Sequence, residues 1–347
     1  MTAAKITVFF LLLALALFAI SFYNLNNEKI ITETRLLMGT VVQIKAVTRD
    51  CGVKAARDAI KRAFSEMERV EGVFSVYKEN SEISRVNALK ADEKLKISDE
   101  VFWLIKKSID YNKKTKGAFD ITVKPLVDLW KRVKTAGQVP DAEEIRAVLE
   151  RIGSKHIELI DASRTISFKK DGMGIDLGGI AKGYAVDMAV KTLKAGGIRG
   201  AVVHAGGDMY CVGVKAPGRP WKVGVQHPRD RGKILVELRL KNKAVNTSGD
   251  YERYFTIGTR RYSHIIDPRN GYPIGDNIVS ATVISDDPVA GDILATTLCI
   301  LGKEGLGIIK AMNGIDAMVV TLENGALKSS VTDGMKERYG LYEKTLS

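Results

Sequence analysis

The order of the predicted strands and helices limits most strongly how this chain can fold. Apolar, β-branched runs predict hairpins over 156–168 and 251–266. Amphipathic helical spacing recurs between other strands, most clearly over 53–70 and 180–193. Because hairpins and helical crossovers alternate in one chain, we predict an α+β fold with a mixed, largely antiparallel sheet and flanking helices. No linker rich in Pro, Gly or Ser divides residues 29–347, so we predict one domain there.

Residues 1–28 are predicted to form a separate segment. The run 6–23 carries no charge, follows Lys5 and has the length of a membrane-spanning helix. Its flanks are typical of a signal peptide or an uncleaved membrane anchor. A buried core helix is the alternative, which so uniform a run at the extreme N-terminus disfavours. We therefore expect residues 29–347 on the outer, periplasmic side of the cytoplasmic (inner) membrane.

The charge balance favours anionic partners. The net charge is +12, which suits anionic ligands or an anionic membrane surface. The chain has no zinc-finger, RNP or basic-arm pattern, so we expect no nucleic-acid binding. Cys51, Cys211 and Cys299 are widely spaced and form neither a disulfide framework nor a CxxC metal site.

An acid, a glycine pair and a lysine precede a predicted helix in the segment 176–187. Backbone N–H groups at a helix start attract anions, and glycine lets a phosphate approach closely. The spacing matches neither a Walker P-loop nor a GxGxxG fingerprint. Gly178, Gly179 and Lys182 are candidates to cradle a pyrophosphate, and tight helix–strand packing is the alternative.

Asp292 and Thr296 are four residues apart on one predicted helix, so they share a face. A carboxylate and a hydroxyl without a nearby His or Cys suit Mg²⁺, which prefers oxygen ligands. The alternative is that Asp292 only complements the helix dipole beside Asp286 and Asp287.

Three further side chains are candidates for chemistry or binding. His264 ends a predicted strand and is either an acid/base or a structural histidine. Tyr77 and Phe119 are able to stack on a flat ring, although single aromatic residues more often belong to a core. The turn 204–208 combines two glycines with polar residues, and backbone geometry alone explains its glycines equally well.

Eight segments in this order together resemble one family, ApbE, the FAD:protein FMN transferases. They are Met38-Gly39-Thr40, residues 74–83, Gly117-Ala118-Phe119-Asp120, 176–187, 204–208, 247–251, 264–268 and Asp292 with Thr296. The resemblance implies a single T-fold-like domain and Mg²⁺-dependent cleavage of the FAD pyrophosphate. FMN would pass to a Thr or Ser hydroxyl of a target flavoprotein through a phosphoester bond, and AMP would be released.

The resemblance also implies roles for residues at matching positions. FAD would be contacted by Met38, Tyr77, Ala118, Phe119, Asp120, Asp176, Lys182 and Ile266. Mg²⁺ would be bound by Asp292, Thr296 and the carbonyl of Gly179, with Asp292 counted as catalytic. His264 would lie near the reacting phosphate. The chemistry also asks for a base on the acceptor hydroxyl, for which His264 and Asp176 compete, and we expect His264 or an acid beside the metal to take the proton. The departures at Ile293, Asn246 and Val86 fall on none of these positions.

The acceptors implied by the resemblance are subunits of membrane redox complexes that carry an Asp-Gly-x-Ser/Thr-Gly-Ala-Thr type motif. Two other functions fit much the same residues. One is an FAD pyrophosphatase that yields FMN and AMP with water as the nucleophile. The other is a non-catalytic, exported FAD-binding protein, against which the presence of both Asp292 and Thr296 argues.

Overall fold

The computed structural model describes residues 13–14, 29–230, 232–342 and 344–346 of the 347. The predicted signal or anchor segment lies almost wholly outside these residues. Among the residues that are described, no helix has the length and apolar character needed to cross a membrane.

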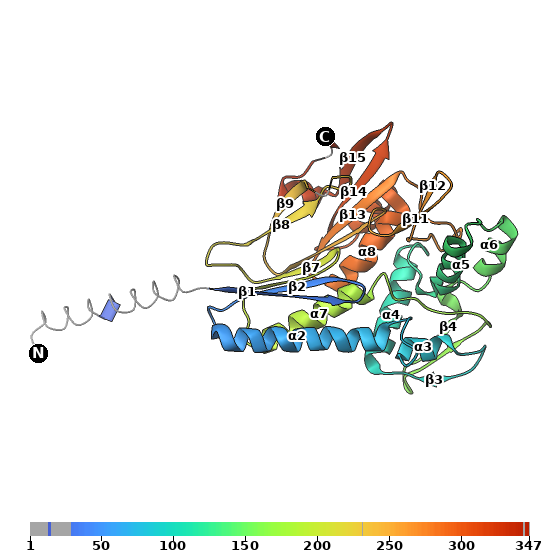
Figure 1. Ribbon diagram of the computed structural model, residues 1–347, viewed down its shortest axis with the longest axis horizontal. Coiled ribbons are helices and arrows are strands. Elements are labelled where there is room, and N and C mark those ends of the chain that lie inside the picture. The colour runs from blue at the N-terminus through green and yellow to red at the C-terminus, as the bar shows by residue number, and fades with distance from the viewer. Residues whose placement is uncertain (1–12, 15–28, 231, 343, 347) are drawn as a thin grey trace, which may run out of the picture.

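A large antiparallel sheet forms the centre of the molecule (Figure 1). Every ladder between its neighbouring strands in the described residues is antiparallel. The predicted α+β fold with a largely antiparallel sheet is therefore confirmed. In spatial order the strands are β1 (Ile30–Leu37), β2 (Thr40–Val47), β6 (Ala201–Ala205), β7 (Asp208–Val212), β10 (Lys243–Gly249), β13 (Ile278–Ser285), β14 (Asp316–Glu323), β15 (Ala326–Val331) and β16 (Lys344–Leu346).

Smaller sheets and helices surround the central sheet. The small sheets are β3 (Leu95–Lys96) with β5 (Thr165–Phe168) and β4 (Ile157–Ile160), β8 (Trp221–Gln226) with β9 (Ile234–Leu240), and β11 (Tyr254–Ile257) with β12 (Arg260–Ser263). The helices are α2 (Gly52–Phe74), α3 (Glu82–Asn87), α4 (Asp99–Lys114), α5 (Lys124–Ala136), α6 (Ala142–Leu149), α7 (Ala181–Ala195), α8 (Pro288–Leu301), α9 (Leu306–Lys310) and α10 (Asp333–Tyr339). Short 3₁₀ turns are η1 (Ile121–Val123), η2 (Ser154–His156) and η3 (Gly302–Gly305).

The two faces of the central sheet are covered by different elements. Helices α2, α7 and α8 pack on one face through apolar side chains such as Phe64, Val186 and Ile293. The β8–β9 hairpin and α10 cover the other face, where Trp221 and Met335 are buried. A third apolar cluster joins α5, α6 and the β11–β12 hairpin beside the sheet. Apolar residues at helical spacing account for α2, whose buried side chains recur every three or four positions.

Helix starts follow the capping residues in the sequence. Ser98 accepts a hydrogen bond from Val101 N at the start of α4. Asp287, and not Asp286, caps α8 by accepting from Val289 N and Ala290 N. From the sequence, the polar residues over 74–87 predict a turn. Ser81 instead caps α3 by accepting from Ser84 N, so the second half of that segment is a helix. That short helix was missed because its capping serine lies within a run of polar residues.

The start of α7 packs unusually closely on the start of α8. A Cβ atom at Gly183 would lie 2.4 Å from the carbonyl oxygen of Pro288 and 2.9 Å from Asp292 Cβ. Real Cβ atoms do not approach backbone so closely, so only glycine allows this helix contact. The contact brings residues of the segment 176–187 next to Asp292.

We predict that Gly183→Ala lowers the free energy of unfolding by about 1–3 kcal/mol, because overpacking forces the two helices apart. The matched control is Gly72→Ala in α2, where a Cβ meets no heavy atom within 4 Å. That control should be neutral or slightly stabilising because alanine favours helix. Thermal unfolding of both variants measures the effect. Equal melting temperatures for the two variants would contradict the packing argument.

Candidate functional site

The turn between β1 and β2 presents the first predicted site residue. Met38 and Gly39 both have left-handed backbone conformations, with φ of 52° and 67°. The N–H of Met38 donates to Glu71 Oε1 at 3.0 Å, and the carbonyl of Gly39 accepts from the Arg253 guanidinium at 3.0 Å. The turn is thereby fixed to α2 on one side and to the segment before β11 on the other.

The glycine pair before α7 meets α8 and the loop after α4. The carboxylate of Asp176 accepts a hydrogen bond from Gly178 N at 2.7 Å, which shapes the turn. A Cβ at Gly179 would lie 3.3 Å from Thr296 Oγ1 and 3.2 Å from the Phe119 ring. Three residues that are far apart in the sequence are therefore in contact, as the predicted site requires.

Asp292 and Thr296 occupy one face of α8, as their spacing predicts. Asp292 is only 1% exposed; its Oδ2 accepts from Gly183 N at 2.9 Å, and its Oδ1 lies 3.5 Å from Lys182 Nζ. The hydroxyl of the neighbouring Thr297 donates to Ile293 O. Thr296 Oγ1, by contrast, has no hydrogen-bond partner in the part of the chain that the structure describes. Thr296 is thus available to a ligand.

Lys182 lies between two carboxylates. Its ammonium contacts Asp208 closely and Asp292 at 3.5 Å. Burial lowers the pKa of the ammonium, but the charges of Asp208 and Asp292 outweigh this and raise it. Burial, followed by the charge of Asp208, raises the pKa of Asp292, while Lys182 opposes that rise. The site therefore contains a charged lysine and a carboxylate that a further cation would stabilise.

The loop after α4 is held by Asp120. The Asp120 carboxylate accepts five hydrogen bonds, from Asn112, Thr122 and Ser154. Ala118 and Phe119 are buried within the same loop. In the structure, the Asp120 side chain holds the loop in place. A direct contact of this side chain with FAD stays a prediction.

Tyr77 and Ile266 differ in their surroundings. Tyr77 is 74% exposed, with Lys131 Nζ 5.3 Å from its ring centre, so one ring face is open for stacking. Its neighbour Lys78 pairs with Glu71, the residue that holds the Met38 turn. Ile266 is buried in the cluster formed with α5 and α6. Contacts of Tyr77 and Ile266 with FAD remain predictions.

His264 follows directly after β12 and has a fixed tautomer. Its Nδ1 lies 2.8 Å from the carbonyl oxygen of Arg253. A carbonyl oxygen only accepts, so Nδ1 carries the proton and the neutral ring keeps a lone pair on Nε2. Desolvation lowers the pKa of His264, and the positive charges of Arg253 and Lys182 add to this, while the hydrogen bond to Arg253 O opposes it. The ring is therefore neutral at neutral pH.

The donor set near Gly179 fits a hard cation such as Mg²⁺. It consists of the buried carboxylate of Asp292 and the unpartnered hydroxyl of Thr296, with Gly179 in contact with Thr296. Oxygen ligands alone are what Mg²⁺ prefers, and it keeps several non-protein ligands. Within the described ranges no cluster of three or more His, Cys, Asp or Glu side chains forms a closed metal site.

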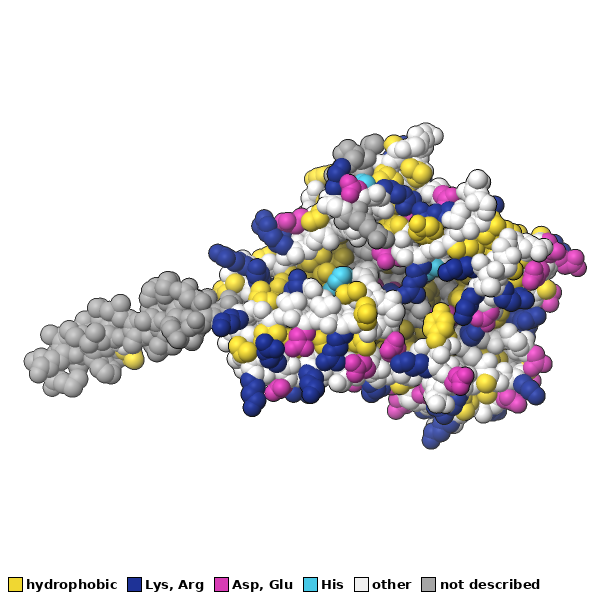
Figure 2. Space-filling view, in the orientation of Figure 1, with side chains coloured by type: hydrophobic (Ala, Val, Ile, Leu, Met, Phe, Trp, Pro, Cys, Tyr) yellow, Lys and Arg dark blue, Asp and Glu magenta, His cyan; other side chains and the backbone are white. Residues whose placement is uncertain are grey.

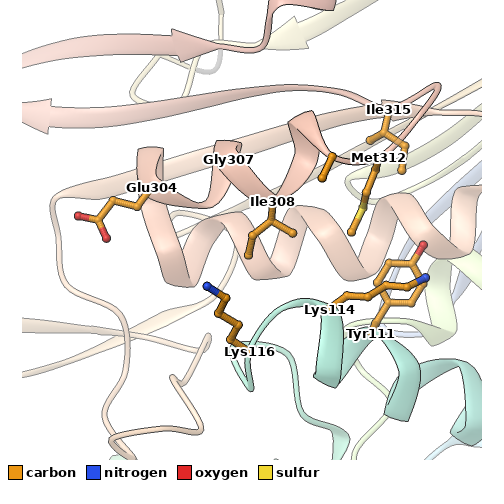
Figure 3. A pocket seen from close by; sticks show the side chains of 9 residues that line it. Tyr111, Lys114, Lys116, Glu304, Gly307, Ile308, Met312 and Ile315 are labelled. Carbon is orange, nitrogen blue, oxygen red and sulfur yellow. The ribbon is translucent and has the colours of Figure 1, made fainter.

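A cavity of about 780 Å³ lies between the end of α4 and α9 (Figure 3). Tyr111, Lys114 and Lys116 line one side, and Ile308 and Met312 line the other. None of the predicted site residues lines it. Basic and acidic side chains are interspersed over the face of the molecule shown in Figure 2, in keeping with an ordinary solvated surface.

The model of the ApbE family matches residues 38–319 of the chain. The chain belongs to the ApbE family. It is 32% identical over 303 residues to the FAD:protein FMN transferase of Vibrio cholerae, covering 86% of this chain and 90% of that one. It is 30% identical over 308 residues to the FAD:protein FMN transferase of Klebsiella pneumoniae, covering 88% and 94%.

Solved structures of ApbE proteins share the fold of this chain. The flavinyl transferase ApbE of Pseudomonas stutzeri, in its apo form, superposes with a TM-score of 0.79 at 29% identity over 91% of this chain and 98% of that one. The ApbE protein of Thermotoga maritima gives a TM-score of 0.78 at 32% identity, covering 91% and 100%.

The structure adds three site residues that the sequence did not single out. Asp208 ends the turn 204–208, and its carboxylate pairs with Lys182. Asn246, from β10, donates to Asp208. Arg253 joins the Met38 turn to His264. The glycine turn before Asp208 was the available signal, whereas nothing in the sequence places Arg253 beside Gly39, 214 positions away.

We predict that His264 titrates well below the usual histidine pKa of about 6.5, with a midpoint near pH 4. Its ring is then neutral at pH 7 and becomes charged only as the pH falls toward 4. The measurement is the pH dependence of histidine ring NMR signals, with His264→Gln to assign the signal. A midpoint at or above 6.5 for that signal would contradict the assignment.

Proposed function

We propose that this chain catalyses Mg²⁺-dependent transfer of FMN from FAD to a Ser or Thr hydroxyl of a target flavoprotein, with release of AMP. The observation that carries the proposal is the meeting of Gly179 with Thr296 on the α8 face that also presents Asp292. The coarser activity follows from the family: the chain is a transferase that moves FMN from FAD to a target protein.

The residues of the site divide the work of holding FAD and the metal. Asp292, Thr296 and the carbonyl of Gly179 would bind Mg²⁺, which supplies positive charge to the pyrophosphate. The exposed ring of Tyr77 offers a stacking surface for the flat part of FAD. Phosphoryl transfer asks mainly for positioning and charge neutralisation, which these side chains and the metal would provide.

His264 is the base that the geometry favours over Asp176. The acceptor hydroxyl oxygen attacks the FMN phosphorus, the bond from that phosphorus to the bridging oxygen breaks, and AMP leaves with the electron pair. The hydroxyl proton passes to Nε2 of His264, which is free because Nδ1–H donates to Arg253 O. Asp176 is less suited, because one of its oxygens already accepts from Gly178 N in the turn.

We also propose a location and a class of acceptor. The apolar run 6–23 supports attachment to, or export across, the cytoplasmic membrane, with residues 29–347 on the outer side. Subunits of membrane redox complexes that carry the Asp-Gly-x-Ser/Thr-Gly-Ala-Thr type motif would then be within reach.

Incubation with FAD, Mg²⁺ and a target bearing that motif should make the target fluorescent in a denaturing gel and release AMP. EDTA should abolish both products. Asp292→Asn should lower the rate by more than about 100-fold. Loss of an outer-shell partner of a metal costs up to about 100-fold, and Asp292 is proposed as a direct ligand. Free FMN and AMP without a labelled target would instead indicate a pyrophosphatase. Bound FAD that survives prolonged Mg²⁺ would indicate a non-catalytic binding protein.

His264→Ala should slow FMN transfer by about 10²–10⁴-fold at saturating Mg²⁺, the usual contribution of a general base. FAD binding, followed by flavin fluorescence, should change little because a general base acts on the acceptor hydroxyl and not on FAD. His227→Ala is the control, since that histidine bonds only within its own loop in the described structure. Transfer at the unmodified rate in His264→Ala would show that another group takes the proton.

A further inference from the structure

The Lys182 ammonium is shared unequally between two buried carboxylates. Asp208 and Asp292 are each 1% exposed. Lys182 contacts Asp208 closely, whereas its distance to Asp292 Oδ1 is 3.5 Å. One ammonium facing two carboxylates leaves one negative charge uncompensated in a buried site. Such a charge is costly unless a proton or a further cation neutralises it.

Asn246 holds Asp208 in place and leaves its own side-chain oxygen unpaired. Asn246 Nδ2 donates to Asp208 Oδ1 at 2.7 Å and to Pro288 O at 3.2 Å. Both partners only accept hydrogen bonds, so the orientation of the amide is fixed. Asn246 Oδ1 consequently faces Gly291 and has no hydrogen-bond partner within the described structure. An unpaired buried oxygen is rare in native proteins and calls for an explanation.

The position of the lysine decides whether Asp292 is available. If the ammonium paired fully with Asp292, it would neutralise the carboxylate that the proposed function assigns to Mg²⁺. Asp208 offers a closer partner and so draws the ammonium away from Asp292. The unpaired Asn246 oxygen is then explained as the consequence of fixing Asp208 where it can do this.

We propose that Asp208, fixed by Asn246, is a positioning residue that keeps the Lys182 ammonium off Asp292 and thereby leaves Asp292 free to bind a divalent cation. This inference rests on the proposed function in one respect, that Asp292 binds Mg²⁺. It assigns Asp208 and Asn246 a role that acts through Lys182 and not through contact with FAD.

The test is Mg²⁺ binding alone, measured by isothermal titration calorimetry on the full-length chain without FAD. Asp208→Asn should weaken Mg²⁺ binding by about 10–100-fold, as loss of other outer-shell partners does. Adding Lys182→Met to that variant should restore binding to within a few-fold of the unmodified chain, because the competing ammonium is gone. Lys182→Met alone should bind Mg²⁺ at least as tightly as the unmodified chain.

The matched control is Asp316→Asn on β14, which removes another buried aspartate paired with a cation, Arg338. It should leave Mg²⁺ binding unchanged. Asn246→Ala is an independent test. It should also weaken Mg²⁺ binding, but by less than Asp208→Asn does. Circular dichroism of each variant shows that it is folded.

The outcomes separate this inference from the proposed function. Unchanged Mg²⁺ binding in folded Asp208→Asn overturns the inference, and so does weakened binding that Lys182→Met fails to restore. In both cases the unmodified chain would still bind Mg²⁺ and transfer FMN. If Asp208→Asn does not fold, unchanged Mg²⁺ binding in Asn246→Ala overturns it. No Mg²⁺ binding by the unmodified chain would overturn the metal part of the proposed function and this inference together.

Discussion

The close contact between the start of α7 and the start of α8 is the constraint on which the site depends. Gly183 has no side chain, so its N–H reaches the carboxylate of Asp292 and the two helices approach at backbone distance. That approach brings Gly179 against Thr296 and Lys182 alongside Asp292. A site divided between residues near 180 and near 292 of the sequence becomes one surface because of a single missing Cβ atom.

Local sequence signals predict many of the helices in this structure. They do not predict its short mixed-polar elements or the contacts between residues far apart in the sequence. Helical periodicity predicted α2 and α7, and the spacing of Asp292 and Thr296 gave their shared face on α8 correctly. The strand Ala326–Val331 and the helix Asp333–Tyr339 were not predicted, because both are short and carry mixed polar residues. Only the register of β7 against β10 places Asn246 opposite Asp208.

The electrostatics of the site follow from how few cations face its buried acids. Asp208 and Asp292 share one lysine, whereas the buried Asp250 contacts two guanidinium groups, from Arg229 and Arg261. The first arrangement is short of positive charge and the second is not. Buried carboxylates that lack full compensation are a mark of binding or catalytic sites, whereas fully paired ones belong to the fold, which is destabilised when one partner is removed. The described part of the chain contains both kinds.

His264 lies where two hydrophobic cores meet. The next residue, Ile265, packs into the main cluster under the central sheet, whereas Ile266 packs into the cluster of α5, α6 and the β11–β12 hairpin. The backbone therefore crosses from one core to the other immediately after the imidazole. Loosening of the smaller cluster alone would displace this crossing while the main cluster, into which α7 and α8 pack, stays intact. On gradual heating, the base proposed for FMN transfer should thus be displaced before the secondary structure around α7 and α8 is lost.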